Sequence, residues 1–192
     1  MFKRILVLLA CLFVLFSSRV SAMNVKVFTD DSKITAALEM LDDIGATEII
    51  ENLQENSVKI RFYDLSQISY SYRNHFAMNT IDNWGNRVIL INVKYQKAPT
   101  EQIACLIAHE SCHKAKVATL AEETTATRKE AQYWSVLKKR NVSYQETPLL
   151  NRLNNLVNLE HTSTVSHDRI EESISNSNFY QNQLAIRERR SF

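Results

Sequence analysis

The sequence contains little of what usually divides or cross-links a protein chain. Its 192 residues include only two glycines, two prolines and three cysteines. Glycine and proline are the residues that most often interrupt helices and strands, and the sequence also has no Gly/Ser-rich linker and no repeated segment. This predicts one continuous, helix-rich domain. Cys105 and Cys112 fall on one predicted helix, roughly 10 Å apart along its axis, and this separation excludes a disulfide between them.

No charge of one sign dominates the chain. Lys and Arg together number 23, Asp and Glu together number 21, and the two kinds are interspersed along the sequence. Because the basic residues form no cluster that would match the phosphates of DNA or RNA, no nucleic acid is expected as a partner. The sequence specifies no oligomeric state.

Long hydrophobic runs are also missing, apart from one near the start. Residues 5–16 are apolar, follow two basic residues and precede a run of small residues that ends at Ala22. Twelve residues are fewer than the roughly 20 that cross a bilayer, so this order predicts a signal peptide over 1–22 and a single mature domain over 23–192. We expect a secreted or periplasmic protein without stable membrane insertion after cleavage. The alternative is a retained N-terminal membrane anchor.

The spacing of apolar residues changes twice along the remaining sequence, which predicts an α+β fold with a helical C-terminal half. Apolar residues recur at helical spacing at both ends and alternate with polar residues in the middle. The predicted strands form a small, mostly antiparallel sheet that includes a hairpin. We expect helices around 32–41, 49–53, 101–116, 120–140, 149–159, 170–174 and 179–184, and strands at 58–63, 68–72, 76–81 and 88–93.

One motif carries specific chemistry. His109, Glu110 and His113 form an H-E-x-x-H pattern within the predicted helix 101–116. Residues four apart share a helix face, so both imidazoles can bind one divalent ion, for which Zn²⁺ is the expected identity. Glu110 points about 100° away and is placed to act as general base toward metal-activated water. The alternative is a pair of ordinary surface or hydrogen-bonded histidines.

A catalytic zinc site needs a third protein ligand. Glu122, Glu123 and Glu130 follow on the next predicted helix, and antiparallel packing of the two helices would place Glu122 and Glu123 level with His113. The alternative is that Glu122 and Glu123 simply favour the helix N-terminus, without any metal. A cysteine ligand is disfavoured, because Cys105 and His113 are about 12 Å apart along the helix.

The motif and the start of the next predicted helix resemble a known family. The residues from His109 to His113, followed by Glu123-Thr124-Thr125-Ala126, resemble the gluzincin metallopeptidases, and the short spacing is most similar to the minigluzincin type. The resemblance covers about residues 88–137. It implies a zincin-like fold in which an edge strand of the sheet binds extended peptide above the motif helix.

The resemblance also implies a role for each motif residue. His109, His113 and Glu123 would be zinc ligands, and Glu110 would be the base and then the acid. The chain departs from several gluzincins at Thr127, where they have an aspartate that supports a histidine ligand. The expected function is a secreted zinc metallopeptidase that hydrolyses peptide or protein substrates.

Two other functions stay open, and so does one part of the site. The chain would also suit a catalytically inactive, zincin-like binding domain, or a helical interaction protein whose motif arose by chance. The candidates for stabilising the tetrahedral oxyanion of the reaction are His161, His167 and Tyr180. Each of these residues also suits a structural or solvent-exposed position.

Overall fold

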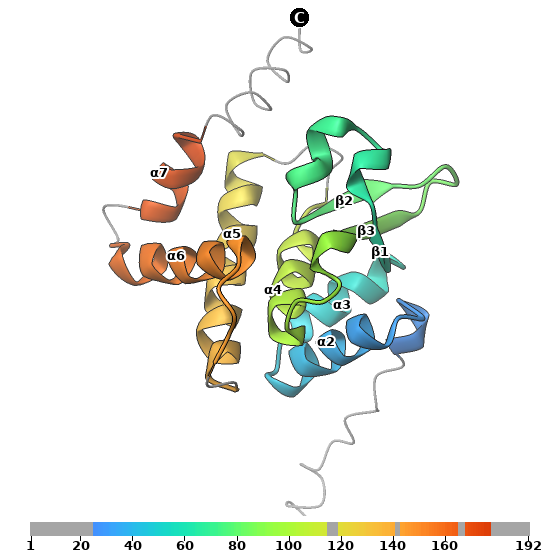
Figure 1. The fold of residues 1–192 in the computed structure, drawn as a ribbon, viewed down its shortest axis with the longest axis horizontal. Helices are drawn as coiled ribbons and strands as arrows, with labels where there is room; N and C mark the ends of the chain where they lie inside the picture. The colour runs from blue at the N-terminus through green and yellow to red at the C-terminus, as the bar shows by residue number, and fades with distance from the viewer. Residues whose placement is uncertain (1–24, 115–118, 141–142, 165–167, 178–192) are drawn as a thin grey trace, which may run out of the picture.

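The computed structural model describes residues 25–114, 119–140, 143–164 and 168–177 (Figure 1). The predicted signal peptide, the predicted helix at 179–184, His167 and Tyr180 lie outside these ranges. The described residues form a mostly helical α+β fold, as expected from the sequence. None of their helices combines the length and the apolar character that crossing a membrane requires.

Six α-helices, three strands and five short 3₁₀ turns make up the described chain. The helices are α2 (Ser32–Asp43), α3 (Thr47–Glu55), α4 (Thr100–Ser111), α5 (Leu120–Leu137), α6 (Pro148–Thr162) and α7 (Arg169–Ser175). The strands are β1 (Lys59–Tyr63), β2 (Ala77–Ile81) and β3 (Arg87–Asn92). The 3₁₀ turns are η1 (Val25–Val27), η2 (Leu65–Gln67), η3 (Tyr70–Asn74), η4 (Val93–Tyr95) and η5 (Lys138–Arg140).

Helix α2 begins where its sequence provides a cap. The carboxylate of Asp31 accepts hydrogen bonds from the backbone N–H groups of Lys33, at 2.9 Å, and Ile34, at 3.1 Å. The apolar face of α2 then buries four residues at helical spacing, namely Ile34, Ala37, Leu38 and Leu41. Gly45 follows with a φ of +74°, which ends the helix before α3 begins.

The sheet is mixed, and this corrects the predicted mostly antiparallel arrangement. Its strand order is β1-β3-β2. β3 is antiparallel to β2, with Ala77 opposite Ile91, and parallel to β1, with Lys59 opposite Val88. The hairpin of β2 and β3 has to be antiparallel because its connection is short, whereas the long segment between β1 and β3 allows a parallel pair.

The segment predicted as a strand at 68–72 instead forms the connection between η2 and η3 and the start of η3. Asp64 caps η2 and Ser69 caps η3 through side-chain bonds to Ser66 N and Ser71 N. Ile68 and Tyr70 are 44% and 73% exposed, so the alternation of apolar residues there does not mark a buried face. The turns cover the outer face of the sheet, where Leu65 packs with Val88 and Leu90.

The main core lies between the sheet and the helices, and α4 is at its centre. Every residue of α4 from Gln102 to Ser111 is buried. Figure 1 shows the sheet, α2 and α3 on one side of α4 and the helices α5, α6 and α7 on the other. Polar groups at the end of α4 are therefore enclosed by both layers.

Candidate metal centre

The motif lies at the C-terminal end of α4 rather than in the middle of a longer helix. The predicted helix 101–116 ends at Ser111, and His113 follows the last helical residue. Side chains from other elements bond the last carbonyl groups: Asn52 of α3 donates to Ser111 O, and Asn79 of β2 donates to Glu110 O at 2.8 Å. His113 N still bonds to Glu110 O at 3.3 Å, so one tight turn continues and keeps His113 beside His109.

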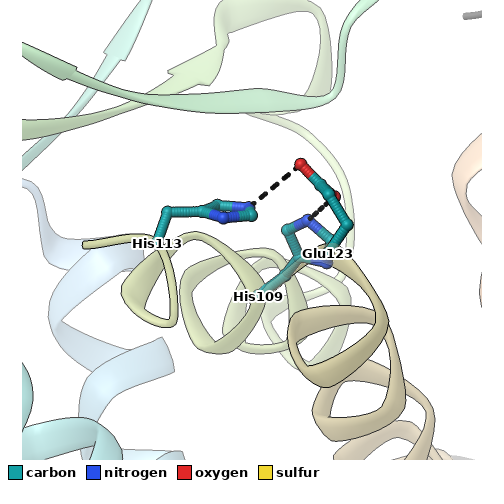
Figure 2. Close-up of side chains that lie close together, drawn as sticks. All are labelled: His109, His113 and Glu123. Atoms are coloured by element: carbon teal, nitrogen blue, oxygen red, sulfur yellow. Dashed lines mark ion pairs between the residues drawn. The ribbon is translucent and has the colours of Figure 1, made fainter. Parts of the chain in front are cut away.

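The structure brings His109, His113 and Glu123 together (Figure 2). The Nε2 atoms of His109 and His113 lie 3.6 Å and 3.7 Å from the two carboxylate oxygens of Glu123. The three potential ligand atoms are all within 4.8 Å of one another. Ligand atoms about 2.0 Å from a tetrahedral ion are about 3.3 Å apart, so a small inward adjustment of this group could hold a metal ion.

Glu123 owes its position to the first turn of α5. Thr119 caps this helix by accepting from Glu122 N at 3.1 Å, and Glu123 N bonds to Thr119 O at 2.9 Å. The carboxylate of Glu123 is thereby directed at the end of α4, and the residue is only 8% exposed. Glu122, the alternative considered from sequence, accepts instead from the backbone N–H of Lys114.

Glu130, the third candidate ligand, contacts the opposite side of the His109 ring. It lies two turns after Glu123 on α5 and is completely buried. Its Oε2 is 2.9 Å from His109 Nδ1, within hydrogen-bonding distance. Its Oε1 pairs with Arg152 of α6. Glu130 therefore fixes which nitrogen of His109 faces Glu123 and supplies the support that Thr127 cannot.

Opposing effects set the protonation of His109 and Glu130. Burial acts to lower the pKa of His109, but the charge of Glu130 and its hydrogen bond outweigh burial, and the pKa is raised. Burial acts to raise the pKa of Glu130, but Arg152 and His109 outweigh it, and the pKa is lowered. Glu130 is therefore held as a carboxylate beside His109 Nδ1, and the opposite nitrogen, Nε2, is the one that faces Glu123 and would bind a cation on losing its proton.

His113 is held neutral. Burial lowers its pKa to about 3, with smaller contributions from the charges of His109 and Arg87. The two rings lie edge to face, with centroids 5.1 Å apart. A neutral imidazole has a lone pair available for a metal ion, so burial prepares His113 for coordination.

Glu110 lies next to this group without belonging to it. Burial raises the pKa of its carboxyl group to about 7. Among the described residues, no side chain or backbone group forms a hydrogen bond with this carboxyl group. A carboxyl group with a pKa near neutrality can both accept and release a proton at neutral pH.

One edge of the sheet lies over the end of α4. β2 pairs only with β3 in the described sheet, so its other edge has no strand partner there. Asn79 of β2 donates to Glu110 O at 2.8 Å and to His113 O at 3.3 Å. The edge strand and the histidine motif are therefore joined directly.

Other residues considered from sequence lie apart from this group. Cys105 is buried and Cys112 half-buried, and no disulfide joins them. Neither belongs to the potential ligand group. His161 is exposed in the last turn of α6. The sequence does indicate that Glu130 lies on the same side of α5 as Glu123, because residues seven apart share a helix face.

Comparison with known proteins adds no relative. The chain matches no protein family, no curated protein and no solved structure.

Proposed function

We propose that this protein is a zinc metallopeptidase of the gluzincin type. The observation that carries the proposal is the group His109, His113 and Glu123, with its three ligand atoms within 4.8 Å. Two imidazoles and one carboxylate are the donor set of catalytic zinc in several hydrolases, and three protein ligands leave one position open. The adjacent Glu110, unbonded among the described residues, favours catalysis over a purely structural site.

The residues have complementary roles in this proposal. Zinc held by the three ligands would act as a Lewis acid on the scissile carbonyl and lower the pKa of water at the site. Glu110 would take a proton from a water molecule at the site as the water oxygen bonds to the carbonyl carbon. Glu110 then delivers the proton to the amide nitrogen as the C–N bond breaks. Glu130 and Arg152 keep His109 in the required tautomer.

The edge of β2 is the proposed binding place for substrate. An extended peptide added along this edge would form backbone hydrogen bonds with the strand and lie over the end of α4. Asn79 holds that strand to the carbonyls of Glu110 and His113, which keeps the peptide in register with the reacting groups. The substrate class is therefore peptides or unfolded protein segments rather than compact folded surfaces.

Metal analysis combined with peptide hydrolysis tests the proposal. The purified protein should contain one zinc per chain and cleave an unfolded protein substrate, with fragments identified by mass spectrometry. Glu110→Gln should keep the zinc and lose at least about a hundredfold in rate, because general acid–base catalysis contributes about 10²–10⁴. Glu123→Ala should lose both zinc and activity.

Each alternative function gives a different result. Zinc without hydrolysis in the unmodified protein would identify a zincin-like binding domain. A protein that holds no stoichiometric metal would be a helical interaction protein with a chance motif, and the peptidase proposal would be wrong.

A further inference from the structure

Arg87 projects from the same sheet face as the residues that pack on α4. Ile89 and Ile91 belong to the main core, whereas Val88 and Leu90 belong to the small core on the opposite face. Because side chains alternate along a strand, Arg87 faces the α4 side two positions before Ile89. The register places Ile89 opposite Asn79 and Arg87 opposite Ile81.

This position lies one step beyond the end of α4. Asn79 contacts the backbone of Glu110 and His113, where the helix has already ended. The next pair on this face of the sheet, Arg87 and Ile81, therefore lies beyond the contact of Asn79 with the end of α4. Two charge interactions agree with this placement, since Arg87 acts on His113 and on Glu122.

The guanidinium group of Arg87 has a donor that nothing satisfies in the described part of the chain. Its Nη2 atom is buried and has no hydrogen-bond partner there. Glu122 is not within ion-pair distance of it and accepts instead from Lys114 N. A buried, unbonded donor on a charged group destabilises the protein, so such a group beside a candidate site indicates a ligand that supplies the acceptor.

The charge of Arg87 indicates what kind of acceptor fits. The other arginine near the centre, Arg152, is already paired with Glu130. Arg87 has no such counter-ion within the described ranges, and the flat guanidinium fork matches a carboxylate in two parallel hydrogen bonds. A neutral carbonyl group would satisfy the donor but leave the charge uncompensated.

We propose that Arg87 binds a carboxylate of the substrate and so selects acidic peptides. This inference rests on the proposed peptidase function and adds a specificity-determining residue to it. The carboxylate comes from an Asp or Glu side chain near the scissile bond or from the C-terminus of the peptide. Both sources have the same chemistry, and matched peptides distinguish them.

Binding of peptides to the zinc-loaded Glu110→Gln protein tests the inference without turnover. Isothermal titration calorimetry would compare two pairs of extended peptides, one with Glu or Gln at the same position and one with a C-terminal acid or amide. In one pair the acid should bind at least tenfold more tightly. Arg87→Gln should reduce that ratio to about one, and Arg87→Lys should keep part of it, because lysine has the charge without the fork.

A matched arginine provides the control. Arg61 is exposed on β1 of the same sheet, and Arg61→Gln should leave the acid preference unchanged. Thermal unfolding of each variant identifies loss of structure, and Arg87→Lys remains informative if Arg87→Gln does not fold. The pair that shows the preference identifies the source of the carboxylate.

Four results would overturn the inference. Equal binding of acid and amide forms in both pairs would do so, as would a preference that persists in Arg87→Gln. Equal loss of hydrolysis of neutral and acidic peptides in Arg87→Gln, without the Glu110 substitution, would place Arg87 at the reacting carbonyl instead. Cleavage without acid preference would leave the peptidase proposal intact, whereas a protein that neither binds nor cleaves any peptide overturns both.

Discussion

At the scale of single residues, the group that could hold a metal ion depends on a residue outside it, because Glu130 lies 2.9 Å from His109 Nδ1. The spacing of His109 and His113 specifies their proximity, because it depends only on local helical geometry. The position of Glu123 followed from antiparallel packing of two consecutive helices. The role of Glu130 did not follow, because its partner Arg152 comes from a third helix whose packing the pattern does not specify.

Glu130 gives a prediction that differs from the one made from sequence alone. The resemblance implies Glu123 as the third ligand, so the sequence alone predicts a sharp loss of zinc binding for Glu123→Ala but not for Glu130→Ala. The contact of Glu130 with His109 Nδ1 instead predicts that Glu130→Gln weakens zinc binding about 10–100-fold, since this is the usual effect of losing such a hydrogen-bond partner. Competition with a chelator of known affinity measures the change.

Glu122→Gln is the matched control for this experiment. Glu122 lies on the same helix but bonds to Lys114 N rather than to either histidine. Its substitution should change zinc affinity less than twofold. An equal effect of both substitutions would mean that Glu130 acts only through the general charge of the site.

At the scale of helices and strands, the spacing of apolar residues predicted most elements. It failed where contacts between distant residues determine the type or the end of an element. Helices with a cap and a regular apolar face, such as α2 and α6, were predicted in place. The alternation at 68–72 was misleading, because five residues do not distinguish a strand from successive 3₁₀ turns. The end of α4 was also missed, because the groups that bond its last carbonyls, Asn52 and Asn79, lie far away in the sequence.

The link between β2 and α4 gives a prediction at this scale. Asn79→Ala removes the donor to two carbonyls, those of Glu110 and His113, and should lower the free energy of unfolding by about 1–3 kcal/mol. Urea denaturation measures the loss. Asn155→Ala, an exposed substitution on α6, should stay within about 0.5 kcal/mol of the unmodified protein. Similar values for both would show that the Asn79 bonds do not stabilise the fold.

At the scale of the whole molecule, the predicted class was right and the arrangement was only partly foreseen. The change in the spacing of apolar residues along the chain predicts an α+β fold, and this is confirmed. The parallel pairing of β1 with β3 could not be derived, because it joins strands that are distant in sequence. The same limitation applies to the central place of α4, which depends on the packing of both layers at once.

Metal removal tests how strongly an ion at the candidate metal centre stabilises the folded protein. Zinc at a thousand times its dissociation constant would stabilise the folded protein by about 4 kcal/mol. For a domain of this size, removal by EDTA should lower the unfolding temperature by on the order of 10 °C. Differential scanning calorimetry measures the shift, and Glu123→Ala should show none. A shift of equal size in that variant would attribute the effect to the chelator rather than to the site.

The two histidines of the motif are anchored to different parts of the molecule. His109 is held from the helical side through Glu130 and Arg152, whereas the backbone of His113 is held from the sheet through Asn79. Any sliding of the hairpin against the bundle therefore alters the gap between the imidazoles. If a peptide bound at the strand edge changes the affinity of this group for an ion, the ion must change the affinity for the peptide by the same factor.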